Sequence, residues 1–243
     1  TGGSVQNAIN ACILSVLIGR SLELAKHRVL QLATASLLHD AGMLRIPEAI
    51  TGKQGKLTDE ERKQVMTHPV RSYRIVAKEL GYPEEIGLAA LQHQERWDGK
   101  GYPRGLSGTN IVLPARIIAV VDAFEAMVSN RPYRNPVIGH TAIRGLLADN
   151  GRRFDPNILK AFVGTMGIYP VGSVVLLNDA RIGRVVDMNP GAPVKPKVKI
   201  MINAEGEPFR NDEGEVVNLS AEPRVHIARA VDPREIQSGG NGS

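Results

Sequence analysis

The chain has 243 residues, a formal net charge of +5 and 42% hydrophobic residues, enough for one good core and a small second one. No apolar run approaches the ~20 residues of a membrane span, and the sequence begins without the basic-then-apolar pattern of a signal peptide. The single cysteine, Cys12, excludes an internal disulfide. We therefore expect a globular protein of the cytoplasm with an anionic partner, and the start at T-G-G-S predicts a fragment that lacks an upstream domain.

Apolar residues at helical spacing run through the first part of the sequence and predict an all-helical domain. The expected helices cover residues 7–24, 25–38, 58–66, 68–80, 84–93, 115–129, 137–149 and 155–166. Thr58 followed by Glu61 is typical of a capping box, and Pro114 suits the first turn of the helix at 115–129. Asp122 lies among apolar neighbours in that helix, so its carboxylate needs a cation or a metal as a partner.

After Gly167 the spacing of the apolar residues changes to that of β-strands. The expected strands are the valine- and isoleucine-rich segments 173–177, 181–188 and 195–202 and the shorter segments 216–219 and 224–230. The predicted fold is mainly α, a helical bundle followed by a small all-β appendage that is either a meander or barrel-like. The expected division is a helical domain over residues 1–167, a β domain over 168–237 and a disordered Gly/Ser-rich tail over 238–243.

The stretch from residue 92 to residue 103, Q-H-Q-E-R-W-D-G-K-G-Y-P, is the most informative part of the sequence. His93 lies near the end of an expected helix, and a glycine-rich loop follows it. His39, Asp40, His68 and Asp122 also lie at the ends or in the middle of apolar helices, so all five side chains can point into one pocket. Imidazoles with a carboxylate suit iron, manganese or zinc-like ions, although a histidine at a helix end is more often structural when taken alone.

Several motifs together identify a family. They are L-H-D-A-G at 38–42, K-L-T at 56–58, H-P at 68–69, H-x-E-R-W-D-G-x-G-Y-P from residue 93 and R-P-Y-R at 131–134. In these motifs the chain resembles the HD-GYP family, a branch of the HD metal-dependent phosphohydrolases whose members act on cyclic di-GMP, over about two thirds of its length. The resemblance implies an HD-type bundle with two divalent cations, of iron or manganese type, that share a bridging aspartate.

Carried over to this sequence, the resemblance assigns metal ligation to His39, Asp40, His68, His93 and Asp122, with His39 and Asp40 also catalytic if the protein is active. Tyr102 resembles the family tyrosine that contacts a guanine base, and Arg131 and Arg134 resemble its phosphate or base contacts. Arginine suits both tasks, since its planar fork pairs with phosphate and stacks on bases. The alternatives are that Tyr102 only packs in the loop and that the arginines only pair with nearby carboxylates.

Three positions depart from the family pattern. Gln94 replaces the second of two consecutive histidines, Asn7 replaces the histidine of the first helix, and Met43 replaces a lysine beside the metals. An amide oxygen is a much weaker donor to a transition metal than an imidazole nitrogen. Losing a cation near the developing charge removes a stabilisation of about 3 kcal/mol. The sequence therefore predicts weakened divalent metal binding, or none.

The resemblance implies a bacterial signalling protein of HD-GYP type, and from these departures we expect its metal site to be impaired. It would act largely as a non-catalytic module that binds cyclic di-GMP or docks onto a signalling protein such as a diguanylate cyclase. The alternative is an active metal-dependent phosphodiesterase that opens cyclic di-GMP to pGpG or GMP. A nucleic-acid-binding domain is disfavoured, because the sequence has no basic stripe with interleaved aromatic residues.

Overall fold

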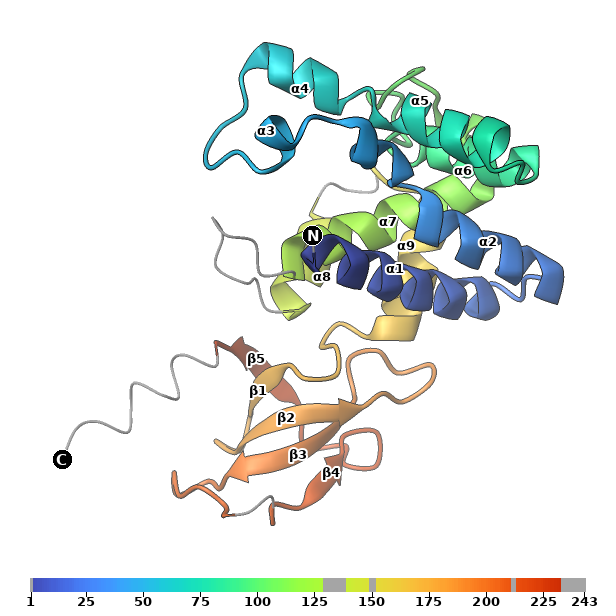
Figure 1. The fold of residues 1–243 in the computed structure, drawn as a ribbon. Helices are drawn as coiled ribbons and strands as arrows, with labels where there is room; N and C mark the ends of the chain where they lie inside the picture. The colour runs from blue at the N-terminus through green and yellow to red at the C-terminus, as the bar shows by residue number, and fades with distance from the viewer. Residues whose placement is uncertain (1, 129–138, 149–151, 211–212, 233–243) are drawn as a thin grey trace. The chain divides into compact units, whose positions relative to one another are not determined.

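The computed structural model describes residues 2–128, 139–148, 152–210 and 213–232 (Figure 1). Its contacts divide the chain into two compact units, one of Thr1–Pro136 with Leu146–Ala161 and the other of Val137–Gly145 with Phe162–Ser243. Helices make up the first unit, and the second contains the β-sheet. The predicted fold class, mainly α with a small β appendage, is thus confirmed, whereas the domain boundary expected at residue 167 stays a prediction.

The longer helices follow the apolar periodicity of the sequence, and three short helical elements, at 41–45, 48–51 and 108–110, were not predicted. In chain order the helical elements are α1 (Gly2–Ser21), α2 (Lys26–Leu38), η1 (Ala41–Arg45), α3 (Glu48–Thr51), α4 (Asp59–Val65), α5 (His68–Tyr73), η2 (Arg74–Glu79), α6 (Glu84–Gln92), η3 (Gly108–Asn110), α7 (Leu113–Val128), α8 (Gly139–Leu147) and α9 (Pro156–Met166). The capping box of Thr58 and Glu61 is confirmed at the start of α4. The helix expected at 68–80 is found as α5 followed by a π-helix, η2, so the helical region is continuous but more loosely wound in its second half.

Helix α7 lies at the centre of the helical unit and packs against α1, α2 and α6. Its side chains Ile117, Ile118, Val120 and Val121 are all fully buried. A helix that is apolar on most of its circumference is stable only when other helices cover it, which explains this central position. The polar residue Asp122 is therefore held in the middle of the bundle, where the site lies.

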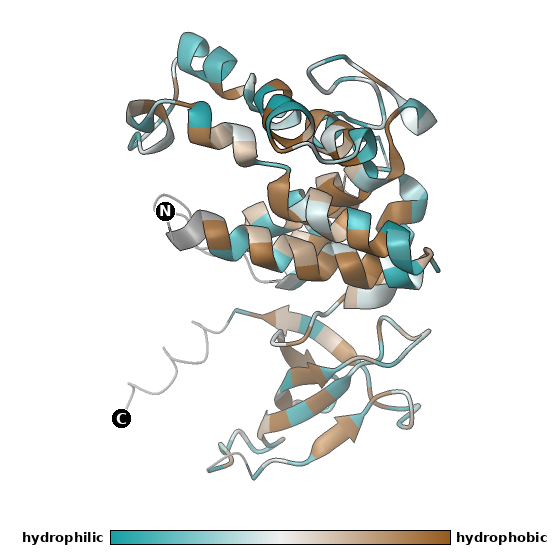
Figure 2. Cartoon of the chain, turned by 45° about the vertical axis from the view of Figure 1, so that its right-hand side comes forward, coloured by the Kyte–Doolittle hydropathy of each residue, from teal (hydrophilic) through white to brown (hydrophobic). Residues whose placement is uncertain are grey.

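The second unit contains one antiparallel sheet with the strand order β4-β3-β2-β1-β5. Its strands are β1 (Val174–Leu177), β2 (Ile182–Asp187), β3 (Lys197–Ile202), β4 (Val216–Asn218) and β5 (Ile227–Val231). Strands β1 to β4 form a meander, and β5 pairs with the outer edge of β1. One face of the sheet buries a valine- and leucine-rich core that includes Val175, Val185 and Val198. Figure 2 shows apolar and polar residues interleaved along these strands, as a sheet with one buried face requires.

Within the described part of the chain, no helix combines the length and the apolar character needed to cross a membrane.

Candidate metal centre

Four helical elements of the first unit bring the predicted ligands together. His39 caps the C-terminus of α2, and Asp40 follows it directly. His68 is the first residue of α5, His93 caps the C-terminus of α6, and Asp122 lies within α7. A side chain at a helix end can reach past its own helix toward a neighbour, which is why helix packing unites residues so far apart in the sequence.

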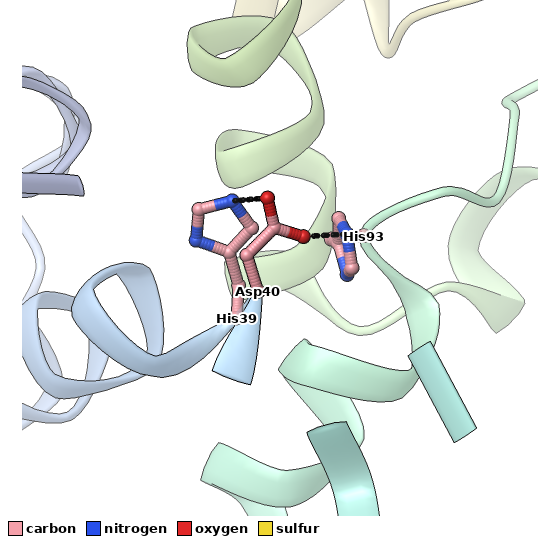
Figure 3. Close-up of side chains that lie close together, drawn as sticks. All are labelled: His39, Asp40 and His93. Atoms are coloured by element: carbon pink, nitrogen blue, oxygen red, sulfur yellow. Dashed lines mark ion pairs between the residues drawn. The ribbon is translucent and has the colours of Figure 1, made fainter. Parts of the chain in front are cut away.

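The carboxylate of Asp40 lies at the middle of the site. Its Oδ1 is 3.3 Å from Nε2 of His68 and 3.4 Å from Nε2 of His93, whereas its Oδ2 is 3.7 Å from Nε2 of His39. Figure 3 shows Asp40 between His39 and His93, with one oxygen directed to each ring. Nε2 of His39 is also 3.8 Å from Oδ1 of Asp122. Asp40 is thus placed to bridge two groups of donors.

All three imidazoles are oriented by the same backbone contact. In each, Nδ1 lies within hydrogen-bonding distance of the carbonyl oxygen three residues earlier, at 2.6 Å for His39, 2.7 Å for His68 and 2.8 Å for His93. A carbonyl oxygen only accepts hydrogen bonds, so each Nδ1 must be the protonated donor. Each neutral ring therefore presents the lone pair of Nε2 to the site, and histidine ligands of metals are commonly fixed by such a bond.

Two observations indicate that this arrangement fits a cation. Nε2 of His39 is buried and has no hydrogen-bond partner among the described residues, and a buried unsatisfied nitrogen is unfavourable. Nε2 of His68 lies only 3.1 Å from Nε2 of His93, so two lone pairs face each other unless a proton or a cation lies between them. His39, Asp40 and His93 each offer a ligand atom, and these three atoms all lie within 4.8 Å of one another.

The charges of the site shift its pKa values in opposite directions. Burial lowers the pKa of His39, but the carboxylates of Asp122 and Asp40 outweigh this effect and raise it to about 9. The protein atoms around the half-exposed Asp40 would raise its pKa by partial desolvation, yet its contact with His93 and the charges of the imidazoles hold it well below the usual range. Burial, followed by the charge of His93, lowers the pKa of His68. The carboxylates of Asp122 and Asp40 thus favour a positive charge at Nε2 of His39, which either a proton or a divalent cation can supply.

Tyr102 lies beside the ligand cluster. Its ring is 6.3 Å from the ring of His68 in an edge-to-face arrangement. Burial, and then the carboxylates of Asp40 and Asp122, raise the pKa of Tyr102 to about 12, so its hydroxyl stays protonated. The structure therefore brings Tyr102 to the site, whereas its contact with a guanine base stays a prediction. Arg131 and Arg134, the predicted phosphate or base contacts, lie outside the described residues.

The three substituted positions lie in the helical unit, and all are half-buried. Asn7 is on α1, Met43 is in η1, and Gln94 directly follows His93. The five predicted ligand side chains still lie together although Asn7 and Gln94 replace imidazoles and Met43 replaces a lysine. The predicted loss of metal affinity is not shown by the structure and stays a prediction.

The substitution Gln94→His tests that loss directly. The backbone oxygen of Gln94 already accepts the N–H of Tyr102 at 3.2 Å, so the backbone is fixed whatever the side chain is. An added imidazole should raise the affinity for Mn²⁺ or Fe²⁺ by about tenfold or more, measured by titration with a competing chelator. Gln64→His places the same substitution on the exposed surface of α4 and should change nothing. Equal affinities of wild type and Gln94→His would contradict the predicted impairment.

Several residues around the ligands were not predicted from the sequence. Gly42 packs so closely against α5 that an added Cβ would lie 2.1 Å from the backbone oxygen of His68. Glu95 is buried and accepts hydrogen bonds from the loop that follows it. Glu125, one turn after Asp122, is buried and accepts a hydrogen bond from Asn10 at 3.1 Å. Gly42 and Glu95 lie inside the recognised motifs, but only their contacts show what they do.

Comparisons with known proteins agree with the fold. A family described as HD domain matches residues 6–158, and a family described as KOW domain associated with HD domain matches residues 174–239. The chain belongs to the HD domain family. Its motifs and its relatives further support the HD-GYP branch of that family, as predicted.

Two curated relatives show how far the similarity extends. A cyclic di-GMP phosphodiesterase of Pseudomonas aeruginosa is 37% identical over 201 residues, which are 83% of this chain and 48% of that protein. A cyclic di-GMP phosphodiesterase of Borreliella burgdorferi is 29% identical over 231 residues, which are 95% of this chain and 60% of that protein. The chain thus spans about half the length of these relatives.

A solved structure described as an HDG"Y"P protein from Bdellovibrio bacteriovorus superposes with a TM-score of 0.55. It shares 18% sequence identity, and the match covers 65% of this chain and 51% of that one. At this level of identity the comparison shows a common fold.

Proposed function

We propose that this chain is a metal-dependent phosphodiesterase module that opens a phosphodiester bond of cyclic di-GMP. The observation that supports this function best is the position of Asp40 among three imidazoles whose Nδ1 atoms are all engaged by backbone carbonyls. Three Nε2 atoms that face one carboxylate bring nitrogen and oxygen donors close to one another, as a divalent cation of this type requires. The curated relatives named as cyclic di-GMP phosphodiesterases favour the same activity.

The residues present would hold two cations of iron or manganese type. His39, Asp122 and one oxygen of Asp40 form the first donor group, and His68, His93 and the other oxygen of Asp40 form the second. When bound, such cations polarise the phosphate and lower the pKa of the attacking water. Each group supplies three protein donors, so positions stay open for water and for phosphate oxygens.

The other residues of the site bind and orient the substrate. The side chain of Asp40 is 49% exposed, so the site is open to solvent on this side and a phosphodiester can approach the ligand cluster. Tyr102, beside His68, offers a ring face to a base and a protonated hydroxyl as a hydrogen-bond donor. Arg131 and Arg134 would contribute positive charge toward the phosphates.

A second candidate is the largely non-catalytic module predicted from the sequence, and the identity of Met43 favours it. A lysine at this position would place a cation beside the phosphate, and a thioether cannot replace that charge. The comparisons do not support a non-catalytic role, so we rank it second. Docking onto a diguanylate cyclase or another signalling protein remains a proposal within this alternative.

One experiment separates the two functions. The chain is purified with Mn²⁺ or Fe²⁺, its metal content is measured by mass spectrometry, and cyclic di-GMP is incubated with it while pGpG and GMP are followed by chromatography. We expect one to two bound ions per chain and product formation that a chelator stops. Binding of cyclic di-GMP without turnover would support the non-catalytic module, and neither binding nor turnover would contradict both.

A further inference from the structure

The loop between α6 and α7 folds back onto the C-terminal end of α6, and Glu95 lies under it. The side chain of Glu95 is buried, with only 4% of the residue exposed. Its Oε1 accepts the backbone N–H of Arg104 at 2.7 Å, and its Oε2 accepts the backbone N–H of Leu106 at 3.0 Å. Both oxygens of a buried carboxylate are therefore used to hold one short segment of the loop, in hydrogen bonds of the strong, charge-assisted kind.

Neighbouring contacts fix the rest of the loop to the same helix end. The backbone oxygen of Gln94 accepts the N–H of Tyr102 at 3.2 Å, and Oε1 of the buried Gln92 accepts the N–H of Val112 at 2.8 Å. Gly101 approaches so closely that an added Cβ would lie 2.5 Å from Cα of Glu95. Only glycine fits there without moving the backbone.

Tyr102 lies between these anchored points. Its own N–H is bound to residue 94, and the segment that follows it is bound to Glu95. The metal-ligand candidate His93 belongs to the same run of residues at the end of α6. The end of α6 that carries His93 therefore holds the loop that carries Tyr102, and with it the position of the Tyr102 ring beside His68. Glu95 supplies two of the hydrogen bonds between this helix end and the loop.

We propose that Glu95 is a positioning residue that holds Tyr102 in place for the substrate without touching a metal or the substrate itself. This inference rests on the proposed function for its kinetic consequence, because Tyr102 matters to turnover only if it contacts cyclic di-GMP. Its structural part, the attachment of the loop, does not depend on any ligand. The two parts can therefore fail separately.

The substitution Glu95→Gln tests the role with the smallest change in shape. An amide nitrogen cannot accept a hydrogen bond, so one of the two loop N–H groups loses its partner and meets a second donor. Glu95→Asp keeps two acceptor oxygens on a side chain one methylene shorter and should recover part of the effect. Glu61→Gln is the matched control, since Glu61 also accepts a backbone N–H, that of Thr58, but lies in the capping box of α4.

In steady-state kinetics with cyclic di-GMP, Glu95→Gln should raise KM about tenfold and change kcat less than threefold. Metal content should stay unchanged. In the Tyr102→Ala background, adding Glu95→Gln should change KM no further, because two residues that act through one contact are not additive. If the effects of Glu95→Gln and Tyr102→Ala on KM multiply in the double variant, the two residues act independently and the proposal is overturned. A loss of bound metal as large as the loss of activity would also overturn it, because Glu95 would then support the fold in general.

Limited proteolysis gives a second measurement that needs neither metal nor substrate. Trypsin can cleave after Lys100 and Arg104 once the loop detaches, and Trp97, the single tryptophan of the chain, reports the loop by fluorescence. We expect Glu95→Gln to be cut in the loop at least several times faster than wild type and Glu61→Gln, when each protein is digested at the same interval below its own Tm. Equal rates would overturn the proposal even if the wild type proves inactive. If the wild type is inactive but Glu95→Gln is still cleaved faster than the wild type, the role of Glu95 is supported and only the proposed function is contradicted.

Discussion

We expect Asp40→Asn to lose its metal and its hydrolytic activity together. Both oxygens of Asp40 face imidazole nitrogens, those of His68 and His93 on one side and that of His39 on the other. The amide replaces one of these oxygens with an N–H₂ group that can only donate, and it also removes the negative charge. Loss of an indirect contact already reduces metal affinity or activity by roughly 10- to 100-fold, so loss of a carboxylate that we propose as a ligand of both cations should reduce hydrolysis by at least ~100-fold.

The metal readout for this variant is thermal unfolding with and without Mn²⁺. An ion present at about 100 times its dissociation constant stabilises the native state by about 2.7 kcal/mol, so the Tm of the wild type should rise while that of Asp40→Asn should not. Asp187→Asn removes a carboxylate from an exposed ion pair with Lys197 in the β unit and should respond like the wild type. A metal-dependent shift in Asp40→Asn equal to that of the wild type would refute the bridging role.

We expect Gly42→Ala to disrupt the site through the backbone. The added Cβ would lie 2.1 Å from the carbonyl oxygen of His68 and 2.6 Å from the backbone N of Ser72, distances that real Cβ atoms do not show. The N–H of Gly42 also donates to Oγ of Ser72 at 2.8 Å. The segment that holds Asp40 and the helix that holds His68 must therefore move apart by about 1 Å, and such a misplacement can reduce activity by about 100-fold.

The same substitution should destabilise the fold by about 1–3 kcal/mol, as overpacking of a filled interior does. Thermal unfolding of the chelator-treated protein measures this change apart from metal binding, and a metal titration of the folded fraction measures the site. Gly164→Ala is the matched control, because its Cβ would meet nothing within 4 Å on α9, so it should be neutral or slightly stabilising. A Gly42→Ala protein with wild-type stability and metal affinity would show that the two segments can separate without affecting the ligands.

Together these two variants probe the site by independent routes, since one changes a ligand and the other changes only its support. If both lose metal while the folded fraction survives, the cluster around Asp40 is a metal centre. If Asp40→Asn loses hydrolysis but Gly42→Ala keeps it, Asp40 is needed for activity, and the segment of Gly42 can move away from α5 without disturbing the site. The metal affinity of the Gln94→His variant then shows how much the missing imidazole at residue 94 weakens metal binding.

The sequence by itself determined the longer helices and the strands, and its motifs supplied the ligand candidates, whereas the short elements η1, α3 and η3 were not predicted. Apolar residues recur at helical spacing up to about residue 166, and Thr58 with Glu61 starts α4 as expected. The charged Asp122 within an apolar run of helical spacing is enough to indicate a cation partner. These features are local, so neighbouring residues in the chain are enough to reveal them.

Only the tertiary structure decided how the ligands meet and what supports them. The sequence does not show that Asp40 turns one oxygen toward His39 and the other toward His68 and His93, because helix packing sets those distances. Nor does it show that both oxygens of Glu95 are used by loop N–H groups nine and eleven residues later. Hydrogen bonds and close contacts between distant residues depend on the whole packed chain, whereas periodicity and capping depend on a few turns of it.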